Sequence, residues 1–161
     1  MFGFLKKKKQ QLVIGSPVKG RAVSLKEVSD PTFRDEMIGK GAAVIPSEGK
    51  IYAPVDGTVS MVFDTLHAVS MVSEKGTEIL IHVGLDTVAL KGDGFQGHVK
   101  AGDTVKKGDL LLTADLEKIK QAGYNPITPV LICNPDAYEA VRAVTGKEVL
   151  PGEDLIEAEE K

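Results

Sequence analysis

Short apolar segments separated by turn residues are the feature of this sequence that most limits its fold. Each segment holds three to seven residues, and Gly, Pro, Asp or Ser stands between most of them. Such a density of short strands predicts an all-β chain, an antiparallel β-sandwich or barrel-like fold with a few short helices. The predicted strands are residues 12–14, 42–45, 58–63, 68–72, 78–84, 110–113 and 129–133.

Two expected turns share one pattern. Residues 17–20 read Pro-Val-Lys-Gly and residues 54–57 read Pro-Val-Asp-Gly, each before a β-type run. We interpret both as turns whose glycines, Gly20 and Gly57, need a positive φ.

Three short helices are expected between the strands. Residues 31–39 have room for one or two turns, and residues 115–122 begin with a capping aspartate. The third begins with Asn134 as its cap and Pro135 in its first turn, and it ends at Gly146.

Composition bounds the class of protein. A chain of 161 residues with 42% hydrophobic residues can bury the core of one domain, and 17 Gly with no Trp indicates many turns around an aliphatic core. The formal net charge of −3 argues against general nucleic-acid binding, which needs a broad basic surface. No secretory signal and no membrane-spanning stretch is visible, so a cytoplasmic location is expected. The single cysteine, Cys133, excludes an intrachain disulfide and is expected in the core.

The two ends of the chain are expected to differ from the domain between them. Residues 1–12 are predicted to form a flexible basic arm, in which four lysines follow three apolar side chains. The arm is either a solvated charge block or a weak tether to an anionic membrane surface. Residues 13–161 are predicted to form a single domain, with the acidic residues 153–161 frayed.

His82 is the first candidate for chemistry. In a strand over residues 78–84, Ile81 and its alternate neighbours face one way, while Leu80 and His82 face the other. An apolar, uncrowded surface around the imidazole would let another protein approach it. A hydrogen-bonded core histidine is the alternative.

His67 lies 15 residues before His82. If the two flanking strands form a hairpin around residues 73–76, pairing of His67 with His82 centres on that turn, so the imidazoles lie directly opposite on one face. His98 lies in a Gly-rich segment and is expected to be exposed without a functional role.

Two facing imidazoles suit phosphoryl transfer. A neutral ring nitrogen accepts the phosphoryl group, and the second ring donates a hydrogen bond to its oxygens. Thr65 is placed to orient His67, and Asp86 to shape the electric field at the rim. An apolar surface that excludes water favours such transfer. The candidates to supply it are Phe33, Met37, Ile38, Phe63 and Val69.

The segment Leu-Ile-His-Val-Gly-Leu-Asp-Thr-Val at residues 80–88 resembles the phosphorylation-site signature of a known family. This family is the glucose-type IIA component of the bacterial phosphoenolpyruvate-dependent sugar phosphotransferase system. Thr-Leu-His-Ala at residues 65–68 is similar to its second-histidine motif. Further matches lie at residues 54–59, 91–95, 102–109 and 128–130, and the resemblance spans about residues 12–150.

The resemblance implies a fold and a reaction. The fold would be the duplicated hybrid motif, and the domain a IIA phosphocarrier. His82 would accept a phosphoryl group on Nε2 from phospho-HPr and pass it to a cysteine of the IIB domain of a sugar permease. His67 would stabilise phospho-His82, with Thr65 hydrogen-bonded behind it. The residues implied at the docking surface are Phe33, Ile38, Phe63 and Val69, with Leu80 beside His82 and Asp86 at the edge.

The resemblance also implies cofactors and partners. No cofactor is required, but some relatives bind zinc through the two histidines and a partner's carboxylate, which here would be His67 and His82. In some bacteria the unphosphorylated form regulates permeases and glycerol kinase. Pro31 and Thr32 stand where apolar residues are usual, which affects partner selectivity. The sugar is not readable, because the permease selects it.

Three other functions fit the sequence less well. A biotinyl or lipoyl carrier domain needs a lysine at a hairpin tip between two anchoring residues, which we do not find in the sequence. A metallopeptidase of the same architecture normally has a His-x-His pair, and the sequence has none. A purely regulatory binding protein would not need both His67 and His82.

Overall fold

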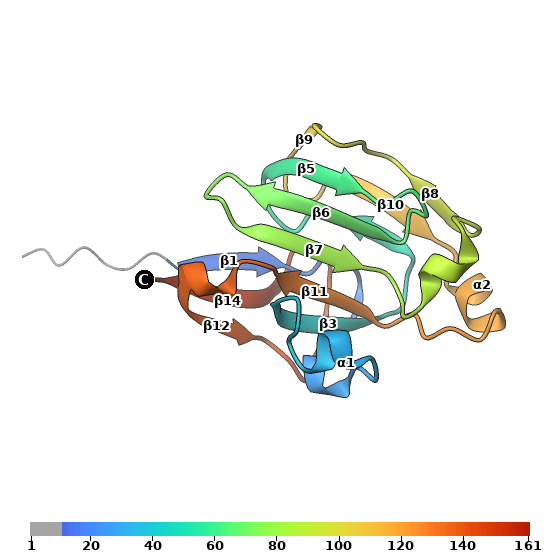
Figure 1. The fold of residues 1–161 in the computed structure, drawn as a ribbon, viewed down its shortest axis with the longest axis horizontal. Helices are drawn as coiled ribbons and strands as arrows, with labels where there is room; N and C mark the ends of the chain where they lie inside the picture. The colour runs from blue at the N-terminus through green and yellow to red at the C-terminus, as the bar shows by residue number, and fades with distance from the viewer. Residues whose placement is uncertain (1–10) are drawn as a thin grey trace, which may run out of the picture.

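The computed structural model describes residues 11–161, in which antiparallel strands dominate (Figure 1). Eight strands form the largest sheet, and two further sheets have three strands each. Every strand pairing among these residues is antiparallel. The all-β prediction is confirmed.

The eight-stranded sheet carries the predicted hairpin near its middle, where β6 pairs with β7. In order across the sheet, the strands are β13 (Lys147–Val149), β2 (Gly20–Val23), β3 (Lys40–Pro46), β11 (Thr128–Ile132), β7 (Glu78–His82), β6 (Ala68–Ser73), β5 (Gly57–Val62) and β9 (Thr104–Val105).

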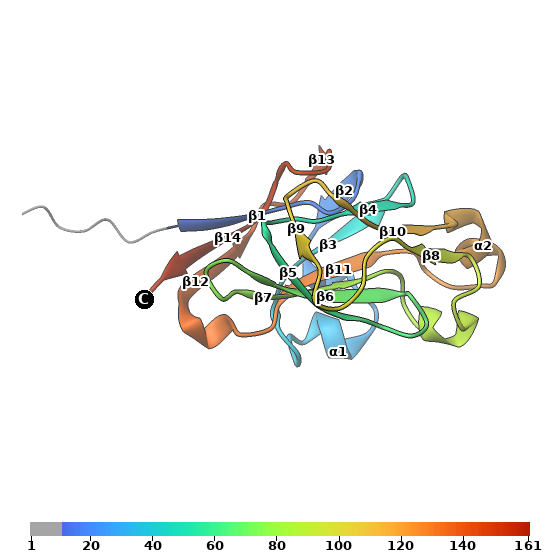
Figure 2. The same cartoon turned by 90° about the horizontal axis from the view of Figure 1, so that it is seen from above.

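The two smaller sheets close the other side of the core. One consists of β1 (Gln11–Gly15), β14 (Asp154–Glu160) and β12 (Tyr138–Ala143), and the other of β4 (Lys50–Tyr52), β10 (Leu110–Ala114) and β8 (Phe95–Gly97). Seen from above, β4 and β10 lie on the opposite side of the molecule from α1 (Pro31–Arg34) (Figure 2).

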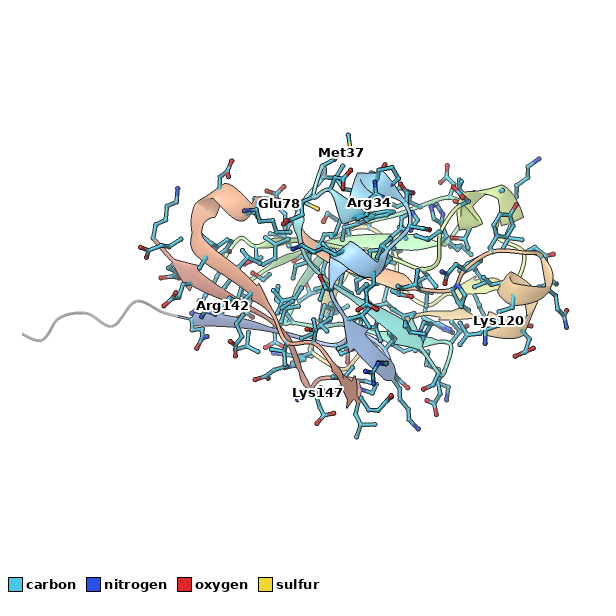
Figure 3. The ribbon with its side chains drawn as sticks, turned by 90° about the horizontal axis from the view of Figure 1, so that it is seen from below. Arg34, Met37, Glu78, Lys120, Arg142 and Lys147 are labelled. Atoms are coloured by element: carbon cyan, nitrogen blue, oxygen red, sulfur yellow. The ribbon has the colours of Figure 1, made fainter. Side chains whose placement is uncertain are left out.

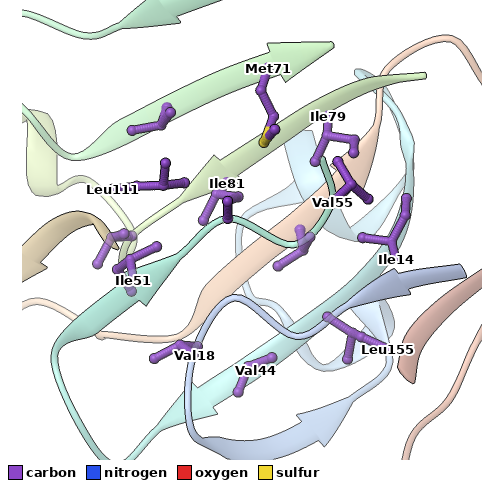
Figure 4. Close-up of a cluster of buried hydrophobic side chains, with 14 of the residues drawn as sticks. Ile14, Val18, Val44, Ile51, Val55, Met71, Ile79, Ile81, Leu111 and Leu155 are labelled. Carbon is purple, nitrogen blue, oxygen red and sulfur yellow. The ribbon is translucent and has the colours of Figure 1, made fainter. Parts of the chain in front are cut away.

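The main core lies between these layers, and alternation along the strands decides which side chains enter it. Ile79 and Ile81 of β7 point inward and are buried in it (Figure 4). Leu80, between them, points to the outer face and packs against a second cluster that contains Phe33. The predicted alternation is confirmed, and it leaves His82 on the outer face with α1.

Two of the expected helices are present but short. The Asp30 carboxylate caps α1 by accepting from the backbone N–H of Thr32, 2.9 Å away, and α2 (Leu116–Gln121) has Asp115 as its cap. Single 3-10 turns form at η1 (Leu25–Glu27) and η2 (Thr87–Leu90).

The expected helix over residues 134–146 is wrong. Pro135 opens the single 3-10 turn η3 (Pro135–Ala137), and the chain then extends as β12, which pairs with β14. Aromatic and β-branched residues such as Tyr138 and Val141 favour a strand, and both are partly buried against the main core. The tertiary pairing therefore outweighs the helix-start signals.

The expected fraying of residues 153–161 is also wrong, because β14 is the central strand of its sheet. Its acidic side chains alternate with Ile156 and Ala158, which are fully buried. β1, the partner of β14, begins at Gln11, so it includes the last two residues of the predicted basic arm, 11 and 12. Residues 1–10 lie outside the described residues, and so does the predicted membrane contact of the arm.

Gly20 and Gly57 are required for a reason other than positive φ. Neither is among the positive-φ glycines, but a Cβ would lie 2.1 Å from the carbonyl oxygen of Ile45 in the first case and 2.2 Å from that of Val72 in the second. Close backbone approach therefore explains both glycines.

Cys133 is exposed just beyond the end of β11, so the prediction that it lies in the core is wrong. Within residues 11–161, helices of the length and apolar content needed to cross a membrane are absent.

Candidate functional site

His82 ends β7 on the outer face of the large sheet, beside the ring of Phe33 at a centroid distance of 4.9 Å. Its Nδ1 lies 2.7 Å from the carbonyl oxygen of Gly84. A carbonyl oxygen only accepts, so Nδ1 carries the proton and donates it. In the neutral ring, Nε2 is then the nitrogen with a free lone pair.

His67 contacts His82 through its ring, with centroids 4.9 Å apart and planes 84° apart. The two residues are nevertheless not paired across the strands as predicted. His82 pairs with Ala68, and the backbone oxygen of His67 accepts from Val83 N–H at 2.7 Å. The predicted register is therefore wrong by one residue.

The rings meet because the chain leaves strand geometry just before β6. In a regular strand, a slip of one residue would turn His67 to the other face. Leu66, however, has a φ of 59°, and its N–H bonds to the carbonyl of Phe63 in a tight turn. This left-handed residue redirects the chain immediately before His67.

The Thr65 hydroxyl lies 2.6 Å from Nδ1 of His67, which agrees with the orienting role predicted for it. When the hydroxyl donates, the proton of the neutral His67 ring is on Nε2, which becomes a hydrogen-bond donor. The Phe63 ring contacts the His67 ring edge-on, with the ring centroids 5.4 Å apart. The donor therefore has an apolar neighbour.

Burial keeps both imidazoles uncharged near neutral pH. Burial lowers the pKa of His67 to about 4, with repulsion from His82 as a smaller cause. Burial also lowers the pKa of His82, although the Gly84 carbonyl and the carboxylates of Asp30 and Asp86 oppose this shift. A nucleophilic nitrogen needs this neutral form, since protonation would occupy its lone pair.

An open hollow of about 310 Å³ leads to His82. Four of the five predicted docking residues line it, namely Phe33, Ile38, Phe63 and Leu80; its other lining residues are Asp30, Thr32, Asp86 and Val88. A second hollow of about 440 Å³ is also lined by Asp30 and Asp86, so these two residues border both hollows. The arrangement is an apolar approach to a histidine with an acidic rim.

Val69 is the exception, and its prediction as a docking residue is wrong. It is fully buried in the main core, because it lies one residue after Ala68, the cross-strand neighbour of His82, and faces inward. Met37, by contrast, is 70% exposed and projects outward beside Arg34 (Figure 3).

Two rim residues were missed from the sequence. Asp30 gives no functional signal in the sequence, because an aspartate before proline is a common helix cap. Val88, which is 53% exposed, gave no signal beyond its place six residues after His82. His98 is exposed as expected, with Nε2 3.4 Å from the Thr113 hydroxyl.

His67 and His82 alone would not complete the predicted zinc site. Among residues 11–161, groups of three or more His, Cys, Asp or Glu side chains able to hold a metal ion are absent. His67 and His82 have both Nδ1 atoms engaged in hydrogen bonds, which leaves two Nε2 atoms as ligands. Zinc completed by a partner's carboxylate stays a prediction.

Comparisons with known proteins identify the family of this chain. The family model for the phosphoenolpyruvate-dependent sugar phosphotransferase system, EIIA 1, matches residues 12–138. The glucose-specific EIIA component of Oceanobacillus iheyensis is 42% identical over 156 residues, which cover 97% of this chain and 94% of that protein.

A longer relative and a solved structure extend the comparison. The glucosamine-specific EIICBA component of Bacillus subtilis is 54% identical over 118 residues, which cover 73% of this chain but 19% of that protein. The glucose permease IIA from Mycoplasma capricolum superposes with a TM-score of 0.84 at 32% identity, covering 95% of this chain and 99% of that chain. This chain therefore belongs to the EIIA 1 family of the phosphoenolpyruvate-dependent sugar phosphotransferase system, as a glucose-type EIIA component.

Proposed function

We propose that the chain accepts a phosphoryl group from phospho-HPr on Nε2 of His82 and passes it to a cysteine of the IIB domain of a sugar permease. One observation carries the proposal: the hydrogen bond from Nδ1 to the Gly84 carbonyl leaves Nε2 with the free lone pair, in a ring that lines an apolar hollow. The family to which the chain belongs supports the choice of reaction.

The transfer balances without a cofactor. The lone pair of Nε2 attacks phosphorus, the bond from phosphorus to the donor breaks, and its electron pair stays with the donor. Phosphorylation makes the His82 ring cationic while Nδ1 keeps its proton. The Gly84 carbonyl then accepts a stronger, charge-assisted hydrogen bond. The second step reverses these events toward the thiolate of the acceptor.

His67 is the group that meets the charge of the phosphoryl oxygens. Its ring contacts His82, and its Nε2–H is free to donate when Thr65 donates to Nδ1. A neutral donor held by its neighbours stabilises developing charge without reorganising, which is the arrangement that favours transfer.

The rim determines which partners fit. Ile38 and Val88 are exposed apolar contacts, and Asp30 and Asp86 add two carboxylates beside His82. A partner with an apolar patch and a positive side chain next to its reactive residue complements this surface, and we assign that chemistry to HPr.

Replacing both rim carboxylates, Asp30→Asn with Asp86→Asn, is expected to raise the KM for phospho-HPr about tenfold, with kcat within about twofold. Asparagine preserves the cap at residue 30 and tolerates the left-handed φ of 60° at residue 86, so the change is one of charge. Steady-state kinetics at low and high salt measure it, and the difference from wild type should shrink as salt rises.

Asp93→Asn is the matched control, because Asp93 is an exposed carboxylate paired with Lys118 and does not line the hollow. It should leave the KM unchanged. An unchanged KM in the double variant, or an equal rise in the control, would contradict the role of the rim.

The proposed function is tested by incubation with radiolabelled phosphoenolpyruvate, enzyme I and HPr, followed by mapping of acid-labile phosphate. We expect label on His82, none in His82→Ala, and wild-type labelling in His98→Ala. Label on His67 or His98 in the wild type overturns the assignment.

The same rim is our proposed surface for regulatory partners such as permeases and glycerol kinase. A phosphoryl group would add about two negative charges next to Asp30 and Asp86, so binding that tolerates only the unphosphorylated rim would follow the phosphorylation state.

A further inference from the structure

We propose that Thr87 is a positioning residue that selects the phosphorylated nitrogen of His82 by holding the Gly84 carbonyl in place. The inference rests on the proposed phosphotransfer for its meaning. The arrangement it describes belongs to the unphosphorylated chain.

Thr87 is fully buried at the start of η2, and its hydroxyl donates to the carbonyl oxygen of Val83 at 2.5 Å. The N–H of Val83 donates to the backbone oxygen of His67. Val83 is itself fully buried, so its carbonyl has no access to water as an alternative partner. The Thr87 hydroxyl thus holds Val83, which follows His82 in the chain and is hydrogen-bonded to the backbone of His67.

The methyl group of Thr87 lies against Gly84, the residue after Val83. Gly84 has a φ of 82°, and a Cβ there would lie 2.5 Å from Thr87 Cγ2. The methyl group therefore fills the face that glycine leaves open. Since glycine has the widest backbone freedom of any residue, the direction of its carbonyl is set by the hydrogen bonds that hold the two adjoining peptide planes.

Two backbone hydrogen bonds also hold this segment in place. The N–H of Gly84 donates to the Ile127 carbonyl at 3.1 Å, and the N–H of Leu85 donates to the Asn125 carbonyl at 2.9 Å. These bonds hold the nitrogen side of each peptide plane. On the oxygen side, the Thr87 hydroxyl holds the first plane, and the second plane carries the Gly84 carbonyl that His82 contacts.

The chemical consequence is a choice of tautomer. A neutral imidazole places its proton on either nitrogen, and the hydrogen bond made by one nitrogen decides which. When the Gly84 carbonyl is fixed, the proton is on Nδ1 and Nε2 is nucleophilic. When the carbonyl moves, the form with the proton on Nε2 gains population and cannot accept a phosphoryl group there.

Thr87→Val and Thr87→Ser separate the two contacts, since valine keeps the methyl group and serine keeps the hydroxyl. In Thr87→Val we expect about a tenfold shift of the tautomer ratio toward Nε2–H, the effect of one lost hydrogen bond. The kcat with phospho-HPr should fall several-fold while KM stays within about twofold, because the docking rim is untouched. Thr87→Ser should keep the wild-type tautomer and kcat.

The tautomer is measured from the imidazole nitrogen chemical shifts of His82 in the unphosphorylated protein. Thr77→Val is the matched control: Thr77 is also fully buried, its hydroxyl bonds to that of Tyr138, and it lies just before the opposite end of β7. Its loss should lower stability without moving the tautomer ratio.

The outcomes are distinct. A wild-type ratio in Thr87→Val, a shift in Thr87→Ser, or equal shifts in Thr87→Val and the control each overturn the role of the Thr87 hydroxyl. Were Thr87→Val to unfold, Thr87→Ser alone would decide, because a shifted tautomer there rules out the hydroxyl as the determinant and an unshifted one supports it. Failure of the wild type to take label would contradict the proposed function. The tautomer measurement would still test whether Thr87 positions the Gly84 carbonyl.

Discussion

Replacing His67 by glutamine is expected to trap the phosphoryl group on His82. Loading should continue, because the Nδ1 bond of His82 to Gly84 does not involve His67 and leaves Nε2 available. Transfer to the IIB domain should fall by about a hundredfold or more, the usual cost of removing one prearranged donor from developing oxyanion charge. The measurement is two separate half-reactions with labelled protein, loading from phospho-HPr and discharge to the IIB domain.

Glutamine cannot replace the His67 donor because of the way the His67 ring is held. Thr65, Phe63 and burial fix the His67 ring against His82. A glutamine amide has more rotatable bonds and no ring for these contacts, so its N–H is not prearranged. His98→Gln makes the same chemical change at an exposed histidine and should leave both half-reactions unchanged. Discharge at the wild-type rate in His67→Gln would contradict the donor role, as would a failure to load.

Strand alternation made most of the fold readable from the sequence. The short apolar runs are strands, and the alternation around His82 predicts the face to which its side chain points. Such patterns are local, so a single sequence carries them. The third predicted helix failed because the choice between helix and strand for residues 138–143 depends on a partner strand at the far end of the chain.

The site was readable only where its signals were local. His82, His67, Thr65 and Asp86 lie within 22 residues of one another, and all four meet in or beside the site. The register error arose at Leu66, since a bulky residue with a left-handed backbone gives no compositional sign. The approach of Asp30 and Phe33 to β7 depends on how α1 packs, which no local pattern encodes.

Truncating Ile156 to alanine is expected to lower the free energy of unfolding by about 3 kcal/mol, within the range for deleting a large buried aliphatic side chain. Ile156 is fully buried in the central strand of its sheet, and its Cδ1 lies 3.0 Å from where a Cβ on Gly41 would be, so it fills the space that this glycine leaves. In a domain of this size the melting temperature should drop by about 6–12 °C, measured by thermal unfolding.

Glu157→Ala is the control on the next residue of β14. Its carboxylate lies 3.9 Å from Arg142 Nε in a partly exposed ion pair, so its loss should change stability by no more than about 0.5 kcal/mol. Equal effects of the two substitutions would mean that the acidic end of the chain is not part of the core. Phosphotransfer by Ile156→Ala at low temperature should match the wild type, because the cavity opens in the main core whereas His82 lies on the outer face of β7. Stability and transfer should therefore respond to different residues.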